Sequence, residues 1–202
     1  MKLIEKSFIC SFLLILAFNA VAFSAQCADI ENSVLRMHVI ANSDSEEDQK
    51  IKLTVKDEVV KEGAKLLENA ENKEEAMNIL MENILLLEKT ANSELVKNGF
   101  DEKAKVSIEK TFFPTRQYET TTLPAGIYDS VLVKIGEAKG KNFWCVMFPS
   151  MCIPMAQKED KLSEVLTSKE YEITKKPQNY KIQWKTAEIF EKIRNFLKNY
   201  KE

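Results

Sequence analysis

The single histidine of the chain, His38, is the side chain best suited to acid–base chemistry near neutral pH. A histidine that activates a protein nucleophile needs a serine or cysteine beside it, and the sequence has no Gly-x-Ser-x-Gly segment to present such a serine. His38 shares one face of a predicted strand with Arg36, and Asp44 follows soon after. One imidazole excludes sites that need two or three, and we expect His38 to be a surface residue that faces a partner or is hydrogen-bonded.

Two other segments approach known binding motifs but lack essential residues. The acidic run over residues 44–48 has neither the alternating ligand spacing nor the glycine of a calcium loop. Ser43 and Glu46 instead have the spacing of a helix capping box. Residues 136–141 imitate a phosphate-binding loop but are one residue short and precede a predicted strand. We therefore predict no catalytic residue, no metal and no cofactor, although the many carboxylates leave a paired-acid hydrolase open.

The composition indicates a globular protein without a nucleic-acid partner. The chain has 202 residues, of which 45% are hydrophobic and 30% are charged, as is typical of one folded domain with extensions. Its formal net charge is −2, and a mildly acidic body offers no clustered cationic face for a phosphate backbone.

Residues 1–28 have the pattern of a secretory signal peptide. Lys2 and Lys6 precede an apolar run over residues 8–23, which ends in the small residues of Ala20-Val21-Ala22. We expect cleavage within residues 22–28, and an uncleaved N-terminal anchor is the alternative. The remainder of the chain is then secreted.

Export changes what the cysteines can do. Cys145 and Cys152 flank a short segment that a turn at Pro149-Ser150 could close. In an oxidising compartment they form a candidate disulfide, which would add about 2.5 kcal/mol to the free energy of unfolding in the chain-entropy estimate. The alternative is a pair of buried thiols, since both cysteines have apolar neighbours.

Hydrophobic periodicity divides the chain into strands and helices. Period-two alternation predicts strands over residues 34–41, 105–113, 126–135 and 142–148. Spacings of three and four predict helices from residue 46 and from residue 73 to Asn98-Gly99. The expected fold is a two-layer α+β domain over residues 29–155, with a mainly antiparallel sheet of about four strands covered by two long helices in the order β-α-α-β-β-β.

The C-terminal region has a different pattern. Residues 156–182 are polar and predict a linker or extension, with a short strand over residues 171–174. Residues 183–202 predict a basic amphipathic helix. Such a helix can contact an anionic membrane surface or pack on its own domain, and both alternatives stay open.

Two blocks of residues resemble the stage II sporulation protein R family. The first block is Leu35-Arg-Met-His-Val-Ile-Ala-Asn-Ser-Asp-Ser45, and it continues through Asp48-Gln49 to Lys56-Asp57. The second comprises Pro114-Thr-Arg, Leu123-Pro-Ala-Gly126 with Tyr128, Gly140 with Asn142, and Trp144-Cys-Val-Met-Phe-Pro149 followed by Cys152. The partner-binding candidates taken from these blocks are Arg36, His38, Asn42, Ser43, Asp44, Pro114, Thr115, Leu123, Pro124, Gly126 and Trp144.

The resemblance implies a signalling protein of endospore formation. Members are exported into the space between the forespore and mother-cell membranes, where they activate a membrane-embedded aspartic protease that processes pro-sigma-E. The implied role is non-enzymatic. The alternative function is a secreted hydrolase that acts on cell wall or peptide.

Overall fold

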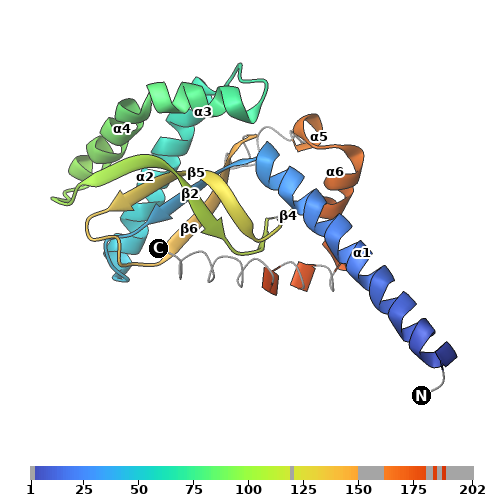
Figure 1. Cartoon of the computed structure of the whole chain (residues 1–202). Coiled ribbons are helices and arrows are strands. Elements are labelled where there is room, and N and C mark those ends of the chain that lie inside the picture. Colours follow the sequence, from blue (N-terminus) through green and yellow to red (C-terminus); the bar gives the residue numbers. More distant parts are fainter. Residues whose placement is uncertain (1–2, 119–120, 150–161, 181–183, 186–187, 190–202) are drawn as a thin grey trace. The chain divides into compact units, whose positions relative to one another are not determined.

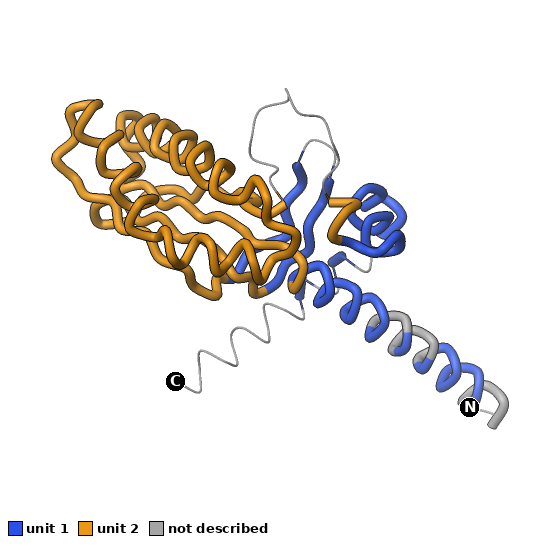
Figure 2. Tube along the Cα trace, turned by 90° about the horizontal axis from the view of Figure 1, so that it is seen from above, with its two compact units in different colours: residues 1–31, 112–126, 166–202 blue, residues 32–111, 127–165 orange. Residues whose placement is uncertain are grey.

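The computed structural model describes residues 3–118, 121–149, 162–180, 184–185 and 188–189. The chain divides into two compact units, which Figure 2 distinguishes by colour. Unit 1 comprises residues 1–31, 112–126 and 166–202, and unit 2 comprises residues 32–111 and 127–165. Each unit is described by itself.

Unit 2 is built on a mixed four-stranded sheet in the order β2-β5-β1-β6. Its strands are β1 (Leu35–Ile40), β2 (Ala104–Phe113), β5 (Gly126–Ile135) and β6 (Asn142–Phe148). Strand β1 runs parallel to β5 and antiparallel to β6. The α+β class and all four strands are confirmed, but the parallel central pair was not anticipated. Parallel neighbours need a long crossover, which the segment between β1 and β5 supplies.

Three helices cover one face of this sheet, where the sequence predicts two (Figure 1). They are α2 (Glu46–Leu66), α3 (Lys73–Glu82) and α4 (Ile84–Lys97). The predicted second helix is interrupted at Asn83, whose backbone angles of φ −106° and ψ 15° are not helical. The Asn83 side chain donates to the Ile79 carbonyl at 2.8 Å and so satisfies the end of α3.

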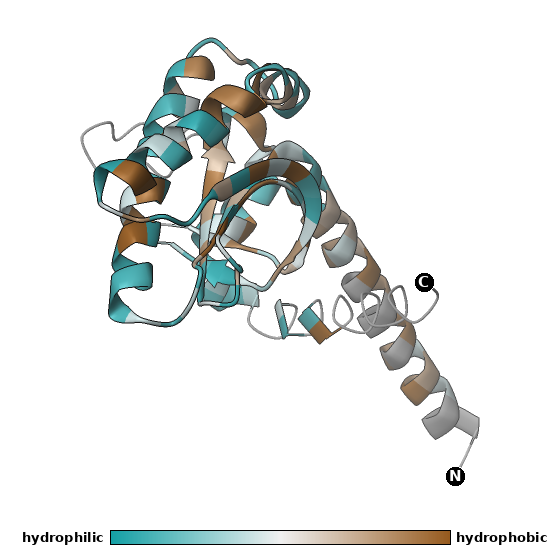
Figure 3. Cartoon of the chain, turned by 90° about the vertical axis from the view of Figure 1, so that its left-hand side faces the viewer, coloured by the Kyte–Doolittle hydropathy of each residue, from teal (hydrophilic) through white to brown (hydrophobic). Residues whose placement is uncertain are grey.

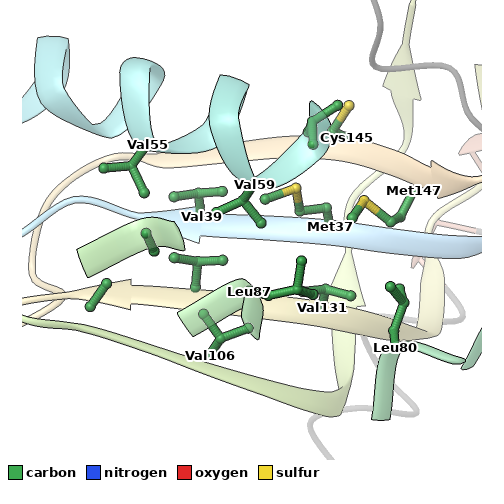
Figure 4. Packing of buried hydrophobic residues seen from close by; sticks show 14 of the residues in the cluster. Met37, Val39, Val55, Val59, Leu80, Leu87, Val106, Val131, Cys145 and Met147 are labelled. Carbon is green, nitrogen blue, oxygen red and sulfur yellow. The ribbon is translucent and has the colours of Figure 1, made fainter. Parts of the chain in front are cut away.

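The core of unit 2 lies between the helices and the sheet. Figure 4 shows Val55 and Val59 of α2 above Met37 and Val39 of β1. Every second residue of β1 points into this core, as its alternation predicts. Gly63 of α2 allows close packing, because a Cβ there would meet the Met147 side chain of β6.

The start of α2 differs from the predicted capping box. Ser45, not Ser43, is the N-cap, and its hydroxyl accepts a hydrogen bond from the Asp48 N–H at 3.1 Å. Ser43 lies two residues outside the helix. Its hydroxyl donates to the Asp48 carboxylate instead, so Glu46 has no capping partner in Ser43.

Unit 1 contains α1 (Leu3–Ser33), the short strands β3 (Arg116–Gln117) and β4 (Thr122–Leu123), α6 (Ser168–Lys175) and the 3-10 turn η1 (Pro177–Tyr180). Helix α5 (Leu162–Val165) belongs to unit 2. The predicted strand over residues 171–174 is wrong. A capping box formed by Thr167 and Glu170 starts α6 there, and Ile173 and Thr174 are buried.

The two ends of the chain can be compared with the predicted signal peptide and the predicted C-terminal helix. Helix α1 continues past the predicted cleavage range of residues 22–28. Within the described part of the chain, no helix is both long and apolar enough to cross a membrane. Residues 184–185 and 188–189 are helical, but most of the predicted helix over residues 183–202 lies outside the described residues.

Candidate functional site

The two sequence blocks meet where the loop after β1 lies against the β5–β6 hairpin loop. The Gly140 N–H donates to the Ala41 carbonyl at 2.9 Å, and the Lys139 N–H donates to the Asn42 carbonyl at 3.1 Å. These bonds extend the β1–β6 ladder past Ile40, which pairs with Asn142. We call residues 41–45, together with Asp48, Lys52 and residues 136–142, the loop junction.

Asp48 is the acceptor at the centre of this junction. Its Oδ2 accepts hydrogen bonds from Ser43 Oγ at 2.5 Å and from Asn42 Nδ2 at 3.1 Å. Asn42 also reaches across the junction, since its Oδ1 accepts from the Glu137 N–H at 2.9 Å. Asp48 is buried in the first turn of α2, where a carboxylate is favoured by the helix dipole. Two of the candidate residues, Asn42 and Ser43, thus bind within the fold.

Lys141 is held through both of its backbone groups. Its N–H donates to Asp44 Oδ1 at 2.7 Å, and its carbonyl accepts from Lys52 Nζ at 3.0 Å. Lys52 Nζ also donates to Gln49 Oε1 at 2.6 Å. Burial lowers the pKa of Lys52, opposed by the nearby Asp44 carboxylate and reinforced by the Lys141 ammonium. Asp44 is exposed but joins the hairpin to the β1–α2 loop.

Both glycines at the ends of the hairpin loop are required by close approach. Gly136 has φ +55°, and a Cβ there would collide with the Asn42 side-chain oxygen. At Gly140 a Cβ would collide with the Ser43 carbonyl oxygen. The loop joins β5 to β6, so a strand follows it. A phosphate-binding loop is followed by a helix.

His38 lies beside the junction on the sheet face opposite the helices. Its ring stacks on Trp144 of β6, with centroids 3.8 Å apart and planes inclined at 18°. Its Nε2 donates to Asn142 Oδ1 at 2.8 Å. Burial lowers the pKa of His38 and the Lys134 ammonium lowers it further, while the hydrogen bond to Asn142 opposes both. The neutral imidazole is therefore favoured near neutral pH.

Arg36 and His38 are both buried, contrary to the expectation of a surface face. Arg36 is 0% exposed and His38 is 6% exposed. The Arg36 guanidinium lies 4.8 Å from the centroid of the Tyr128 ring on β5, a cation–π arrangement. Their part in partner binding stays a prediction, but both side chains are first of all components of the folded structure.

The remaining candidates of the second block lie in unit 1. Leu123 and Pro124 are buried, and Pro114 and Thr115 are half-buried. Leu123 pairs with Arg116 between β4 and β3. At Gly126 a Cβ would collide with the Glu31 carboxylate of α1, so close packing accounts for this glycine.

The structure describes one of the two cysteines of the predicted disulfide. Cys145 is buried on β6, facing the core of unit 2, while Cys152 lies outside the described residues. The pairing stays a prediction. No group of three or more His, Cys, Asp or Glu residues that could hold a metal ion occurs among the described residues.

The sequence motifs missed two residues of the junction. Asp48 belongs to the continuation of the first block and to the acids at a predicted helix start, but neither pattern predicts that it accepts hydrogen bonds from Asn42 and Ser43, and no motif names Lys52. Their spacing was a usable signal, because residues 48, 52, 55 and 59 continue one helical stripe that otherwise points into the core. A charged residue on a buried stripe needs an internal partner.

The fold defines the class of protein as an α+β domain in which a strand–loop–helix segment is hydrogen-bonded to a β-hairpin. Such a fold does not by itself assign a function. The sequence model of the stage II sporulation protein R family matches residues 31–158. The chain belongs to this family, which assigns it a role in sporulation.

A curated relative that the chain matches is "Stage II sporulation protein R" of Bacillus subtilis (strain 168). The two sequences are 32% identical over 123 residues, which is 61% of this chain and 55% of the relative. The match thus spans about half of the relative's length. No solved structure matches the chain.

Proposed function

We propose that the chain is a secreted, non-enzymatic signalling protein of endospore formation. It acts in the space between the forespore and mother-cell membranes, where it activates the membrane-embedded aspartic protease that processes pro-sigma-E. The family match over residues 31–158 is the observation that carries this proposal. The cationic and apolar N-terminus supports the export step.

The geometry around His38 supports an activator rather than a hydrolase. A general base must reach the proton that it removes from substrate or nucleophile. His38 instead donates to an amide oxygen and stacks on an indole ring. The junction carboxylates of Asp44 and Asp48 accept hydrogen bonds from Lys141, Asn42 and Ser43.

One exposed part of the sheet lies at the junction end of β1, β5 and β6. Ile40 pairs with Lys134 on one side and with Asn142 on the other, and Trp144 follows two residues along β6. We call these four residues the Trp144 surface. Lys134 and Asn142 are exposed, while Ile40 and Trp144 are half-buried. Tryptophan is enriched in protein contacts, and an exposed charge beside it can steer a partner of opposite charge.

Binding by itself does not activate a protease. The activator shifts the equilibrium between inactive and active protease only by the ratio of its affinities for the two states. We therefore expect the Trp144 surface to contact a part of the protease whose arrangement differs between those states.

The test is cleavage of pro-sigma-E in a non-sporulating host that also makes this chain and the protease. Cleavage is expected only when all three proteins are present and the chain retains its export signal. Lys134→Glu is expected to reduce cleavage about tenfold or more, because reversing an exposed charge within a contact places like charges together. Lys89→Glu on α4 is the matched control, since Lys89 is equally exposed on the helical layer.

Several outcomes would reject the proposal. Cleavage that does not depend on this chain removes the activator role, and equal cleavage by the Lys134 and Lys89 variants removes the Trp144 surface as the contact. Turnover of cell-wall or peptide substrates by the purified chain would establish the hydrolase alternative instead.

A further inference from the structure

The apolar side chains of α1 change from exposed to buried between residues 21 and 23. The large apolar side chains described before this point are exposed: Phe8, Ile9, Phe12, Leu14, Phe18 and Val21. Beyond it, Phe23, Cys27 and Ile30 are 6%, 4% and 0% exposed. Figure 3 shows hydrophobic segments along this helix. The two parts of α1 therefore contribute differently to the folded structure.

The second part of α1 packs within unit 1. The Phe23 ring stacks on Tyr180, with centroids 5.8 Å apart, and lies edge-on to Trp184 at 5.7 Å. Two residues before the end of α1, the Glu31 carboxylate occupies the space that a Cβ at Gly126 would need. Residues from Phe23 onward thus belong to the packed structure of unit 1.

We propose that the bond between Ala22 and Phe23 is the site of signal-peptide processing. A signal peptidase requires small side chains at the first and third positions before the bond, which Ala22 and Ala20 supply. Water adds across this bond, leaving a carboxylate on Ala22 and a new α-amino group on Phe23. The inference rests on the export step of the proposed function.

The other small residues of the cleavage range fit less well. Cleavage after Ala25 would place Phe23 at the third position before the bond, and cleavage after Ala28 would place Gln26 there. Both would also remove Phe23 from its packing against Tyr180 and Trp184. The small residues before the bond and the burial of Phe23 therefore both favour cleavage between Ala22 and Phe23.

The test is the mass and first residue of the protein exported from cells that express the full chain. We expect a chain that begins at Phe23. Ala22→Leu is expected to abolish this product, because leucine is too large for the position before the bond. Ala25→Leu is the matched control and is expected to leave processing unchanged, since Ala25 is exposed and follows the bond.

A first residue of Gln26, Cys27 or Asp29, or an uncleaved chain that stays in the membrane, would overturn the processing site while leaving export intact. A chain that never leaves the cytoplasm would overturn both the export step and this inference.

The packing of Phe23 has a separate readout in Trp184. The chain has two tryptophans, so Trp144→Phe leaves Trp184 as the single indole. In that background Phe23→Ala is expected to shift the emission to longer wavelength and increase quenching by acrylamide. Unchanged emission and quenching would remove the structural argument for retaining Phe23, and with it the selection of this bond.

Discussion

Asp48 shows how one buried carboxylate can hold the loop that precedes its own helix. It accepts from Asn42 and Ser43, while its own N–H is bound by Ser45. At the residue scale, three polar residues of the first sequence block therefore have partners inside the fold. Hydrogen bonding within the loop junction therefore accounts for the polar residues at these three positions, without a partner protein.

Asp48→Ala is expected to lower the free energy of unfolding by about 2–3 kcal/mol. The substitution leaves the Asn42 amide and the Ser43 hydroxyl without their acceptor in a half-buried site. Urea denaturation measures the effect. Glu47→Ala is the control, because Glu47 is exposed in the same helical turn. Equal losses in the two variants would contradict a central role for Asp48.

At the scale of elements, the junction depends on how closely the β5–β6 loop approaches the β1–α2 loop. The predicted strand over residues 142–148 agrees with β6, and the predicted hairpin loop is observed. The contact between this loop and residues 41–45 could not be predicted. Nothing in a local pattern says which two loops meet, since that depends on the order of strands in the sheet.

Gly140→Ala is expected to destabilise unit 2 by about 1–3 kcal/mol, as is typical of overpacking. The added methyl group would meet the Ser43 carbonyl oxygen, a backbone atom that cannot rotate away. Denaturation gives the loss in stability. Hydrogen exchange at the Lys139 and Gly140 amides locates it, because both donate across the junction. Lys139→Ala is the exposed control.

If these amides exchange as slowly in the Gly140→Ala variant as in the original chain, the close approach of the two loops is not needed to hold the junction together. Faster exchange confined to the hairpin, with the remaining sheet protected, is the expected pattern.

At the scale of the whole molecule, part of the pH dependence of stability can be traced to one side chain. His38 is the one histidine, and its pKa lies below the ordinary value of 6.5, chiefly because the ring is buried. The unfolded chain therefore binds this proton more readily than the folded chain does. The associated stability is fully present above pH 6.5 and is lost as pH falls through the folded pKa.

We expect the free energy of unfolding to fall as the pH is lowered below about 6.5, and His38→Gln to remove this slope. Lys134→Gln is expected to reduce it, because the Lys134 charge contributes to lowering the His38 pKa. Asp129 does not interfere. Burial raises its pKa, but Lys73 and Lys110 outweigh this and hold it below 3.8. A slope that persists without His38 would contradict the assignment.

Secondary structure was largely determined by local pattern. The alternation of Leu35, Met37 and Val39 predicts the buried side of β1, and the stripe through Val55 and Val59 predicts that of α2. These predictions succeed because strand and helix periods are properties of neighbouring residues. The break at Asn83 escaped detection because the apolar spacing continues through it.

The sequence by itself determined the α+β class, the four strands, the family and the identities of the motif residues. The tertiary structure decided that β1 runs parallel to β5, that Arg36 and His38 are buried, and that Asp44 binds the backbone of Lys141. The physical reason is that burial and hydrogen-bond partners depend on segments about 90 to 100 residues apart, such as Asp44 with Lys141 and His38 with Asn142. Local pattern carries no information about such pairs.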